Sequence, residues 1–534
     1  MSGNDRSSES GSALTRREVL SGAAGVGAVA VFGGLIGGCG GDSRAGGAGA
    51  PVAKSTRRGG TLRVGCTGGG AVDTLDAHAP VSDVDVARIM QLYEPLTEFD
   101  PDFKLVMALA ESVEPEQSPD AWTIRLRPDV EFHDGRTLTA DDVLFSFRRI
   151  LDPKSPKPAA SQISDIDLRR SKKLDERTVR INLTRKNATF AEAISGLYVN
   201  IVPRGYDPKK PVGTGPFAYK SFSPGQQSVF ARNRHYWREG QPRVDEIVIV
   251  DFPDSTARVN ALLSGQVDCI SNLPTGQIGA VQGRSDVKVL EAQTGNFQPF
   301  TMRVDKPPFD DVRVRQAMRL MVDRKQIIEQ ALSGHARLAN DLYSPFDQCY
   351  AHDIPQREQD LDQAKSLLAK AGRSDLAVQL VTAPIFQGTV EAAQVLAEQA
   401  KGAGININVR KLDTGTFYGD NYLKWTFAQD YYLTNPYLLQ AARSDLPTSP
   451  FNETHSNDPQ YTQLINQALS ELDETKRCEI LHEAQQILWS RGGFIVWGFS
   501  NQVDAYSTKI SGLHPSKFGA PLGAYNLASV GFVK

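Results

Sequence analysis

One stretch of the sequence, residues 122–153 (WTIRLRPDVEFHDGRTLTADDVLFSFRRILDP), constrains the fold more than any other. Apolar and polar residues alternate over residues 122–127, which predicts a strand with one buried face. Val130–Phe132 predicts a second short strand, and Asp134-Gly135 then predicts a turn, because glycine accepts the positive φ that such turns need. Thr139 is placed to cap a helix, which the closing Asp-Pro pair ends. These residues predict packing and no chemistry.

The same stretch resembles a pattern of the family 5 solute-binding proteins of ABC importers, the group that includes the dipeptide and oligopeptide receptors. That pattern reads W-x-x-x-L-R-x-x-x-x-F-H-D-G-x-x-x-x-A-x-D-V-x-x-S. The residues that match it here are Trp122, Leu126, Arg127, Phe132, His133, Asp134, Gly135, Ala140, Asp142, Val143 and Ser146. A run of this length is far more specific than a short glycine motif.

Further segments are similar to fixed points of the same family, and together the resemblance covers residues 60–534. They are Thr74–His78, Leu92–Leu96 (LYEPL), Pro211–Phe217 (PVGTGPF), Asn233–Trp237 (NRHYW) and Pro307–Ala317. Ala77 departs from the family, which has proline there. The resemblance implies an α/β, two-lobed fold of the periplasmic-binding-protein type (type II, cluster C), with an extra subdomain inserted in the first lobe.

The resemblance and the order of the predicted strands and helices give an expected division of the chain. Strand, short helix and strand over residues 246–270 predict a parallel crossover unit in the first lobe. We expect lobe I to comprise residues 60–96, 206–294 and 503–534, the inserted subdomain residues 97–205, and lobe II residues 295–502. Helices near 361–371, 388–402, 458–471 and 474–490 are expected to alternate with strands near 376–382 and 405–411.

The first 39 residues read as an export signal rather than as part of the fold. Thr15–Leu20 is similar to the twin-arginine consensus, and Leu35–Cys39 resembles a lipobox, whose cysteine takes a diacylglycerol. We expect Cys39 to be lipidated and residues 40–59, rich in Gly, Ala and Ser, to form a flexible linker. The protein would then be anchored at the outer face of the cytoplasmic membrane. The alternatives are a plain membrane anchor and a leader that is cut without lipid.

Charge and cysteine usage exclude several classes of protein. The formal net charge of −3 offers no basic field for nucleic acid. No C-x-x-C motif occurs. We expect Cys66, Cys269, Cys349 and Cys478 to be free buried thiols, and the alternative is that some of them pair. No metalloprotease, hydrolase or Walker motif occurs, and the 8 histidines lack metal-ligand spacing. We therefore expect neither catalysis, nor a bound metal, nor a cofactor.

One segment, residues 424–431 (KWTFAQDY), predicts a strand that ends at an acid. In peptide receptors of the family an equivalent acid holds the α-ammonium group of the ligand, which implies this role for Asp430. A carboxylate at a closed interface is costly to bury unless a cation pairs with it. The alternative is that Asp430 only caps a turn.

The remaining expected ligand contacts surround that acid. The backbone of residues 424–428 is expected to pair with an extended peptide as an added strand, and a ligand carboxylate is expected to meet Lys424 or Arg443. By analogy with the family, the opposite wall is expected around residues 82–84 and 295–298. The complete predicted set is Asp430, Lys424, Trp425, Thr426, Ala428, Tyr431, Asp83, Asn296, Phe297 and Arg443.

The sequence thus predicts a monomeric receptor that closes its lobes on a peptide-like solute and docks on an ABC permease with its ATPase. The family often continues as D-Y-P-D-P after the acid, whereas this chain has Asp430-Tyr431-Tyr432-Leu433-Thr434, and a Trp of the oligopeptide receptors is replaced near Thr414. Other solutes, such as a metal chelate, haem or an oligosaccharide, therefore stay open. A secreted peptidase and a sensory or adhesive receptor without transport are the rival classes.

Overall fold

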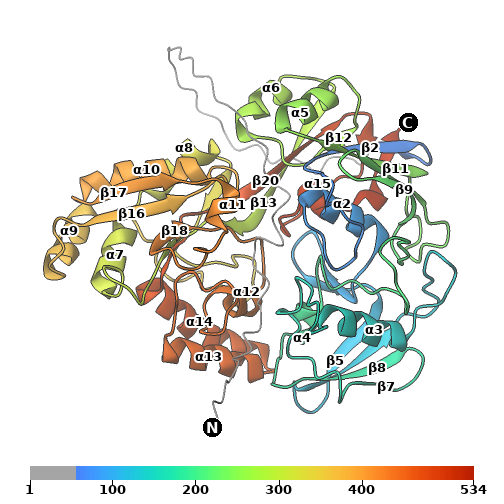
Figure 1. The fold of residues 1–534 in the computed structure, drawn as a ribbon, viewed down its shortest axis with the longest axis horizontal. Helices are drawn as coiled ribbons and strands as arrows, with labels where there is room; N and C mark the ends of the chain where they lie inside the picture. The colour runs from blue at the N-terminus through green and yellow to red at the C-terminus, as the bar shows by residue number, and fades with distance from the viewer. Residues whose placement is uncertain (1–55) are drawn as a thin grey trace, which may run out of the picture.

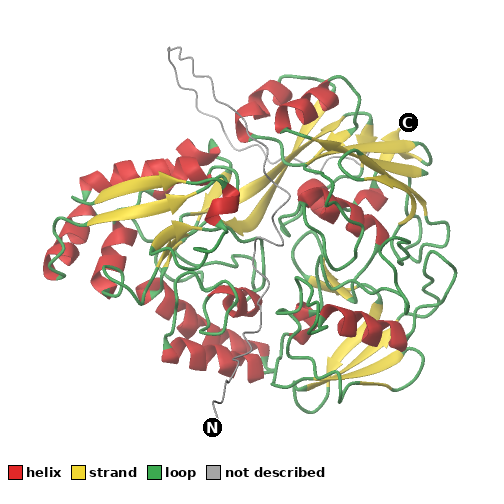
Figure 2. Ribbon diagram, in the orientation of Figure 1, coloured by secondary structure: helices red, strands yellow, loops and turns green. Residues whose placement is uncertain are grey.

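The computed structural model describes residues 56–534, which form two lobes (Figure 1). Lobe I is built on an eight-stranded sheet, lobe II on a five-stranded sheet and the inserted subdomain on a four-stranded sheet. The long antiparallel strands β13 (Val287–Phe297) and β20 (Gly498–Ser507) run between the lobes, and we call this pair the hinge (Figure 2). The predicted export signal, Cys39 and most of the predicted linker lie outside the described residues.

The sheet of lobe I has the strand order β13-β20-β12-β2-β11-β10-β9, and β15 also pairs with β20. Strand β2 runs parallel to both β11 and β12, which confirms the predicted crossover unit. Helices α2 and α5 lie in separate core clusters on the two faces of this sheet. The elements are β2 (Thr61–Thr67), α2 (Asp83–Leu92), β9 (Phe217–Ser223), β10 (Gln227–Arg232), β11 (Glu246–Phe252), α5 (Ser255–Leu263), β12 (Cys269–Ile270), η1 (Thr275–Gln277), α6 (Ile278–Gln282) and β15 (Ala336–Leu338).

The chain ends add a small three-stranded sheet to lobe I, in the order β1-β22-β21. Its elements and their neighbours are β1 (Thr56–Arg57), β21 (Ile510–Ser511), α15 (Pro521–Ala524), η2 (Leu527–Ser529) and β22 (Gly531–Val533). Strand β1 pairs with β22, so the beginning and the end of the described chain lie side by side.

The inserted subdomain is an antiparallel sheet, β5-β6-β8-β7, with α3 packed on β7 and β8. Its elements are β3 (Thr97–Phe99), β4 (Leu105–Met107), β5 (Ala110–Pro115), β6 (Ala121–Leu126), α3 (Ala140–Ile150), β7 (Lys172–Lys173), β8 (Thr178–Asn182) and α4 (Phe190–Ala193). The predicted strand at residues 122–127 and the helix after Thr139 are confirmed. The predicted strand Val130–Phe132 is wrong: only a single bridge, Glu131 to Thr137, forms there, because the chain turns back at once.

Lobe II has a mixed sheet, β17-β16-β18-β14-β19, and a second helical layer. Its elements are β14 (Phe300–Met302), α7 (Val312–Leu320), α8 (Arg324–Leu332), α9 (Leu361–Lys370), β16 (Ala377–Thr382), α10 (Thr389–Gly402), β17 (Asn406–Lys411), α11 (Thr414–Phe417), β18 (Phe427–Gln429), α12 (Tyr437–Ser444), α13 (Pro459–Ser470), α14 (Glu474–Arg491) and β19 (Phe494–Ile495). The four helices and two strands predicted from the sequence are confirmed to within two residues.

Three of the sequence motifs meet at one buried carboxylate, that of Glu94. It accepts hydrogen bonds from the hydroxyls of Thr214 (2.9 Å) and Tyr236 (2.8 Å) and from the indole N–H of Trp237 (2.9 Å). A Cβ on Gly213 would lie 2.0 Å from a backbone oxygen of α2, so only glycine fits there. The motifs therefore fasten lobe I together where the inserted subdomain joins it, and their role is structural.

The cysteine prediction is half right. Cys66 and Cys269 are free and buried on neighbouring strands, as expected. Cys349 and Cys478, however, form a disulfide that joins a loop of lobe II to α14. Their positions are 129 residues apart, so only the tertiary fold brings the two thiols together.

The cap of α3 gives a first test of the local structure. The Thr139 hydroxyl and backbone N–H both donate to Asp142, at 2.7 and 2.9 Å, in a capping box. We expect Thr139→Ala to lower the free energy of unfolding by about 1 kcal/mol, because the helix N-terminus loses a partner. Chemical denaturation measures this, with Thr448→Ala, an exposed threonine, as the control. Equal stability of the two variants would contradict the assigned cap.

Candidate functional site

Asp430 follows directly after β18 in lobe II, and its side chain is fully buried. One carboxylate oxygen accepts a hydrogen bond from the hydroxyl of Tyr418 and the other from that of Tyr422, both at 2.9 Å. The backbone N–H of Tyr431 donates as well, at 2.8 Å. The carboxylate is therefore held in one orientation, which suits the binding of a cation.

A second buried carboxylate, that of Glu453, lies beside Asp430. The Tyr422 hydroxyl is 2.9 Å from an oxygen of each acid, so the two carboxylates are within two hydrogen-bond lengths of each other. The hydroxyl of Tyr432 donates to the other oxygen of Glu453. Two acids that meet on one hydroxyl make this part of lobe II electronegative. No sequence pattern pointed to Glu453, which lies in a loop 23 positions beyond Asp430.

The strand before Asp430 is not an edge strand, which corrects the predicted strand addition. Strand β18 pairs with β14 on one side, and Ala428 pairs with β16 on the other. The carbonyl of Thr426 accepts from the backbone N–H of Arg303, and the N–H of Lys424 donates to the carbonyl of Asn421. A peptide cannot add to a strand whose backbone groups are already paired on both sides.

The side chains just before β18 point to different surroundings. Lys424 is exposed, and its ammonium donates to the backbone oxygen of Asp420 at 2.6 Å. The half-buried Trp425 donates from its indole N–H to the carbonyl of Phe417 at 3.3 Å and stacks on that ring. The geometry therefore shows Trp425 packed within lobe II and Lys424 at its surface.

Two further predicted residues of lobe II, Tyr431 and Arg443, contact aromatic rings. Tyr431 is half-buried and stacks on Phe386, with ring centroids 5.0 Å apart. The guanidinium of Arg443, on α12, lies 5.8 Å from the ring centroid of Phe451. An apolar stacking surface and a cation thus lie in the same lobe as the acid pair.

In lobe I, Asp83 is the first residue of α2 and is half-buried. One of its oxygens accepts from the Tyr525 hydroxyl at 2.8 Å and from the Asn272 amide at 3.0 Å. Burial raises the pKa of Asp83, whereas these donors and the nearby Arg258 lower it. The side chain is thus fixed in place at the N-terminus of α2.

Asn296 and Phe297 belong to the hinge rather than to an open wall. The Asn296 amide donates to the Gly519 carbonyl at 3.0 Å and accepts from the Thr434 N–H at 2.9 Å, which joins the two lobes. The Phe297 ring stacks on Tyr432, at 5.1 Å between centroids. Each residue is only 2% exposed. In the structure both side chains are therefore engaged in contacts of the hinge.

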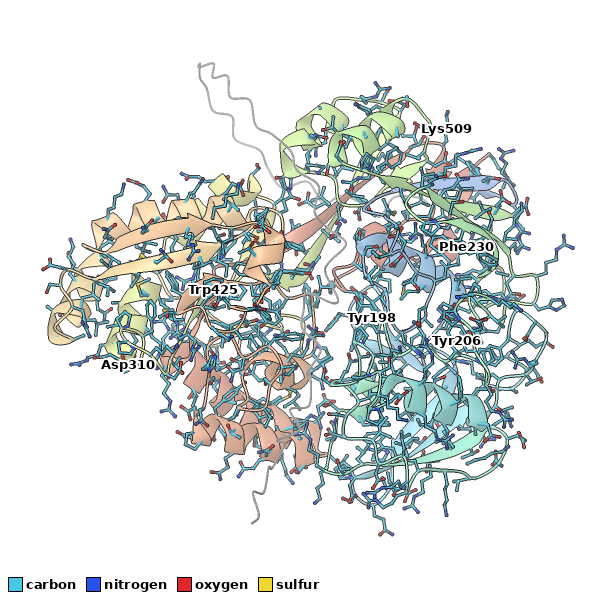
Figure 3. The ribbon with its side chains drawn as sticks, in the orientation of Figure 1. Tyr198, Tyr206, Phe230, Asp310, Trp425 and Lys509 are labelled. Carbon is cyan, nitrogen blue, oxygen red and sulfur yellow. A yellow bond between two sulfur atoms is a disulfide. The ribbon has the colours of Figure 1, made fainter. Side chains whose placement is uncertain are left out.

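One further residue, Tyr198, was not singled out by the sequence. It belongs to the inserted subdomain, and its hydroxyl lies within electrostatic reach of Tyr431, Arg443 and Asp83. Figure 3 places Tyr198 on the side that faces lobe II. Among the predicted residues, Tyr431 directly follows Asp430 in lobe II, and the charges of Tyr431, Arg443 and Asp83 all act on Tyr198. Lys424 and Trp425 make contacts within lobe II, and Asn296 and Phe297 make contacts of the hinge.

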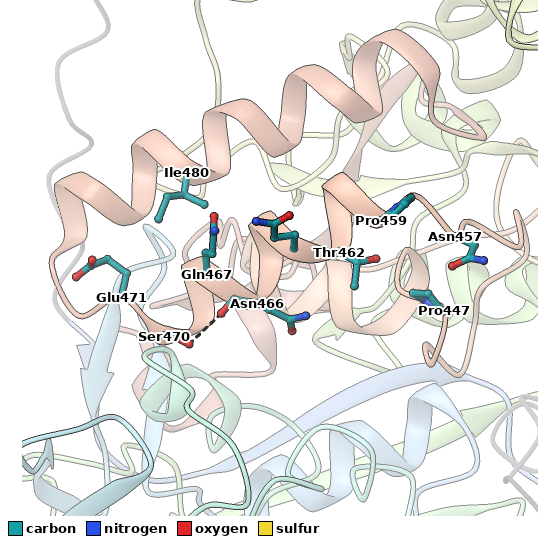
Figure 4. A pocket seen from close by; sticks show the side chains of 10 residues that line it. Pro447, Asn457, Pro459, Thr462, Asn466, Gln467, Ser470, Glu471 and Ile480 are labelled. Carbon is teal, nitrogen blue, oxygen red and sulfur yellow. Dashed lines mark hydrogen bonds between the residues drawn. The ribbon is translucent and has the colours of Figure 1, made fainter.

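A separate surface groove of about 850 Å³ lies on α13 and the start of α14 (Figure 4). Its polar lining is mostly uncharged, with the amides of Asn457, Gln463, Asn466 and Gln467 and a single acid, Glu471. It shares no residue with the region around Asp430. Within residues 56–534, no group of three or more His, Cys, Asp or Glu side chains could hold a metal ion.

The chain is similar in sequence and fold to several extracellular solute-binding proteins. The family model described as "Bacterial extracellular solute-binding proteins, family 5 Middle" matches residues 104–440. Heme-binding protein A of Haemophilus influenzae is 28% identical, over 81% of this chain and 86% of that protein. Probable di/tripeptide-binding protein 5 of Pseudomonas aeruginosa is 27% identical, over 80% of this chain and 88% of that protein. The periplasmic binding protein DppA of Helicobacter pylori, solved with the peptide STSA, has a TM-score of 0.76 at 20% identity, over 90% and 99% of the two chains.

Proposed function

Because the chain belongs to the family 5 bacterial extracellular solute-binding proteins, we propose that it captures a peptide-like solute between its lobes and delivers it to a permease. The family is one of solute-binding proteins for ABC transporters and not of enzymes, so the rival prediction of a secreted peptidase is wrong. The fold is the mixed α/β fold of the periplasmic binding proteins.

The observation that carries the peptide proposal is the Asp430 carboxylate. It is buried, held by two tyrosine hydroxyls and placed next to Glu453. An ammonium group is a compact cation with several N–H donors. Its hydrogen bonds to a carboxylate are strongest where that carboxylate is fixed and shielded from water. Asp430 is therefore proposed to hold the α-ammonium of the solute, and Arg443 to meet its carboxylate. Tyr431, stacked on Phe386, supplies an apolar face for the part between them.

Delivery is proposed to follow closure of the lobes about the hinge, with the lobe bounds predicted from the sequence. Strands β13 and β20 are the long elements that join the lobes, and few residues need to change conformation in such a motion. A solute that contacts both walls stabilises the closed form, and this difference in affinity shifts the population towards it. We propose that the receptor is a monomer and that the closed form docks on the permease and its ATPase.

Anchoring is a separate part of the proposal. We infer from the lipobox-like sequence that Cys39 carries lipid and that residues 40–59 tether the receptor outside the cytoplasmic membrane. No helix between residues 56 and 534 combines the length and the apolar character needed to cross a bilayer. Replacing Cys39 by serine is expected to release the protein from washed membranes.

Native mass spectrometry of the purified protein tests the proposed solute. We expect a retained mass that leaves on denaturation and fragments as a short peptide. A denatured sample of the same preparation is the control for covalent modification. Haem, the ligand named for one relative, would be seen by its mass and its visible absorbance, and its retention would contradict the peptide proposal.

A further inference from the structure

The inserted subdomain presents one tyrosine to the region between the two walls. Tyr198 lies in a short turn whose ends are fixed: Ser195 bridges to Thr97 and Asn200 bridges to Pro95. The Asn200 amide also donates to the carbonyls of Ala77 (3.1 Å) and Leu197 (3.0 Å). One end of the turn is therefore fastened to β3 of the inserted subdomain and the other to lobe I, so the tyrosine that it carries is held in place.

The ring and the hydroxyl of Tyr198 have different surroundings. The half-buried ring packs against the cores of both lobe I and the inserted subdomain. The hydroxyl donates to no residue between 56 and 534, and it is not among the buried polar atoms that lack a partner. Buried tyrosines nearby behave differently, since the hydroxyls of Tyr93 and Tyr525 both donate within the protein. A fixed ring with an accessible hydroxyl is typical of a ligand contact.

The charges around this hydroxyl indicate what it would meet. The charges of Arg443 and Tyr431, from lobe II, and of Asp83, from lobe I, all act on its pKa. A phenol keeps its hydrogen near neutral pH, so this hydroxyl can act as a donor. A solute group between a phenol and a guanidinium faces donors from both, so it must accept hydrogen bonds.

We propose that Tyr198 is a solute-binding residue, which donates its hydroxyl hydrogen to a carbonyl or carboxylate oxygen of the solute. This inference rests on the proposed function, because it places the acceptor end of the solute opposite the cation held by Asp430. The inserted subdomain then supplies part of the binding site. The recognised solutes would carry a cationic end and an acceptor end, as a short peptide does.

Tyr198→Phe tests the inference, because it keeps the ring and removes only the hydroxyl. We expect the affinity for the tripeptide Ala-Ala-Ala, measured by calorimetry, to fall by about two- to tenfold, the effect of one hydrogen bond. The matched control is Tyr219→Phe, which removes an exposed hydroxyl on β9. Melting temperatures of both variants without peptide should equal that of the wild type, which separates a lost contact from a lost fold.

The outcomes separate the inference from the proposed function. If the wild type binds the tripeptide and both phenylalanine variants bind it equally well, Tyr198 is no contact and only the inference fails. If the wild type binds neither Ala-Ala-Ala nor a co-purified peptide, the proposed function fails and the inference fails with it. A loss confined to Tyr198→Phe supports both.

Discussion

Asp430→Asn is expected to weaken the binding of Ala-Ala-Ala by about thirtyfold or more. The substitution keeps the size of the side chain and its acceptor oxygen for a tyrosine hydroxyl, but it removes the negative charge. Removing one partner of a buried, hydrogen-bonded charge pair costs about 2–5 kcal/mol. Calorimetry at low and moderate salt measures the affinity, and the loss should persist at both, because buried charges are screened little.

The matched control for this variant is Asp420→Asn, an exposed acid of the same lobe. It changes the net charge by the same amount and is expected to leave the affinity within about twofold, as is usual for a surface charge. Equal affinities of the wild type and Asp430→Asn would remove the ammonium role. Asp430 would then only fix the turn at Tyr431, as the alternative interpretation of the sequence holds.

The second large effect concerns pH and the contact between the inserted subdomain and lobe II. The backbone N–H of Ala188 donates to the carbonyl of Leu469 at 2.7 Å, so the two parts touch there. The charges of Asp347, Glu474 and Arg477, all of lobe II, act on the carboxyl of Glu192 on α4. Arg477 donates to the backbone carbonyl of Glu471 and makes no ion pair with Glu192.

Burial, and next the negative charge of Asp347, raise the pKa of Glu192 to about 8. Asp347 cannot turn away, because it accepts from the backbone N–H groups of Tyr437 (2.7 Å) and Cys349 (2.8 Å). When the lobes separate, the pKa of the Glu192 carboxyl returns to its ordinary value near 4.5. The touching form therefore binds a proton that the separated form releases.

The sign of the pH effect follows from this difference. The contribution of Glu192 to the free energy of closure is fully present below about pH 4.5. It is lost as the pH rises through about 8. Since Glu192 is half-buried, solvent reduces the effect, and we expect the affinity for Ala-Ala-Ala to fall by about tenfold between pH 5.5 and 8. Glu192→Gln should bind more tightly than the wild type at pH 8 and lose most of this dependence.

Calorimetry in two buffers with different ionisation enthalpies checks this, because it counts the protons taken up on binding. The wild type should take up a proton near pH 7 and Glu192→Gln should not. The control is Glu239→Gln, an exposed glutamate of lobe I, which should behave as the wild type. Proton uptake that is the same in all three proteins would show that Glu192 does not titrate on closure.

The parts of the fold that the sequence predicted are those that local patterns or packing impose. Trp122, Leu126 and Phe132 lie in the core of the inserted subdomain, so alternation and spacing revealed them. The motif residue His133 accepts a hydrogen bond from the Gly213 N–H at 3.2 Å, so two motifs that are distant in the sequence are in contact. Such residues can be recognised in a sequence because few other side chains would fit in their place. They indicate which fold forms and not which solute binds.

The site was predicted less completely, for a physical reason. A role could be assigned to Asp430 because the resemblance to the peptide receptors of the family implies one for the acid after this alternating strand, but Glu453 and Tyr198 lie in loops without a period. Whether β18 is an edge or an interior strand depends on the partners β14 and β16, which the segment itself does not encode. The same holds for the disulfide, since neither Cys349 nor Cys478 carries a local sign of its partner.

The central claim is that the lobes close around a bound solute, and small-angle X-ray scattering tests it most directly. The solute recovered from the protein, or Ala-Ala-Ala, is added to protein freed of ligand by unfolding and refolding. The account predicts a smaller radius of gyration with solute and no such change for Asp430→Asn at the same concentration. A radius of gyration that stays the same when the wild type is saturated would contradict closure.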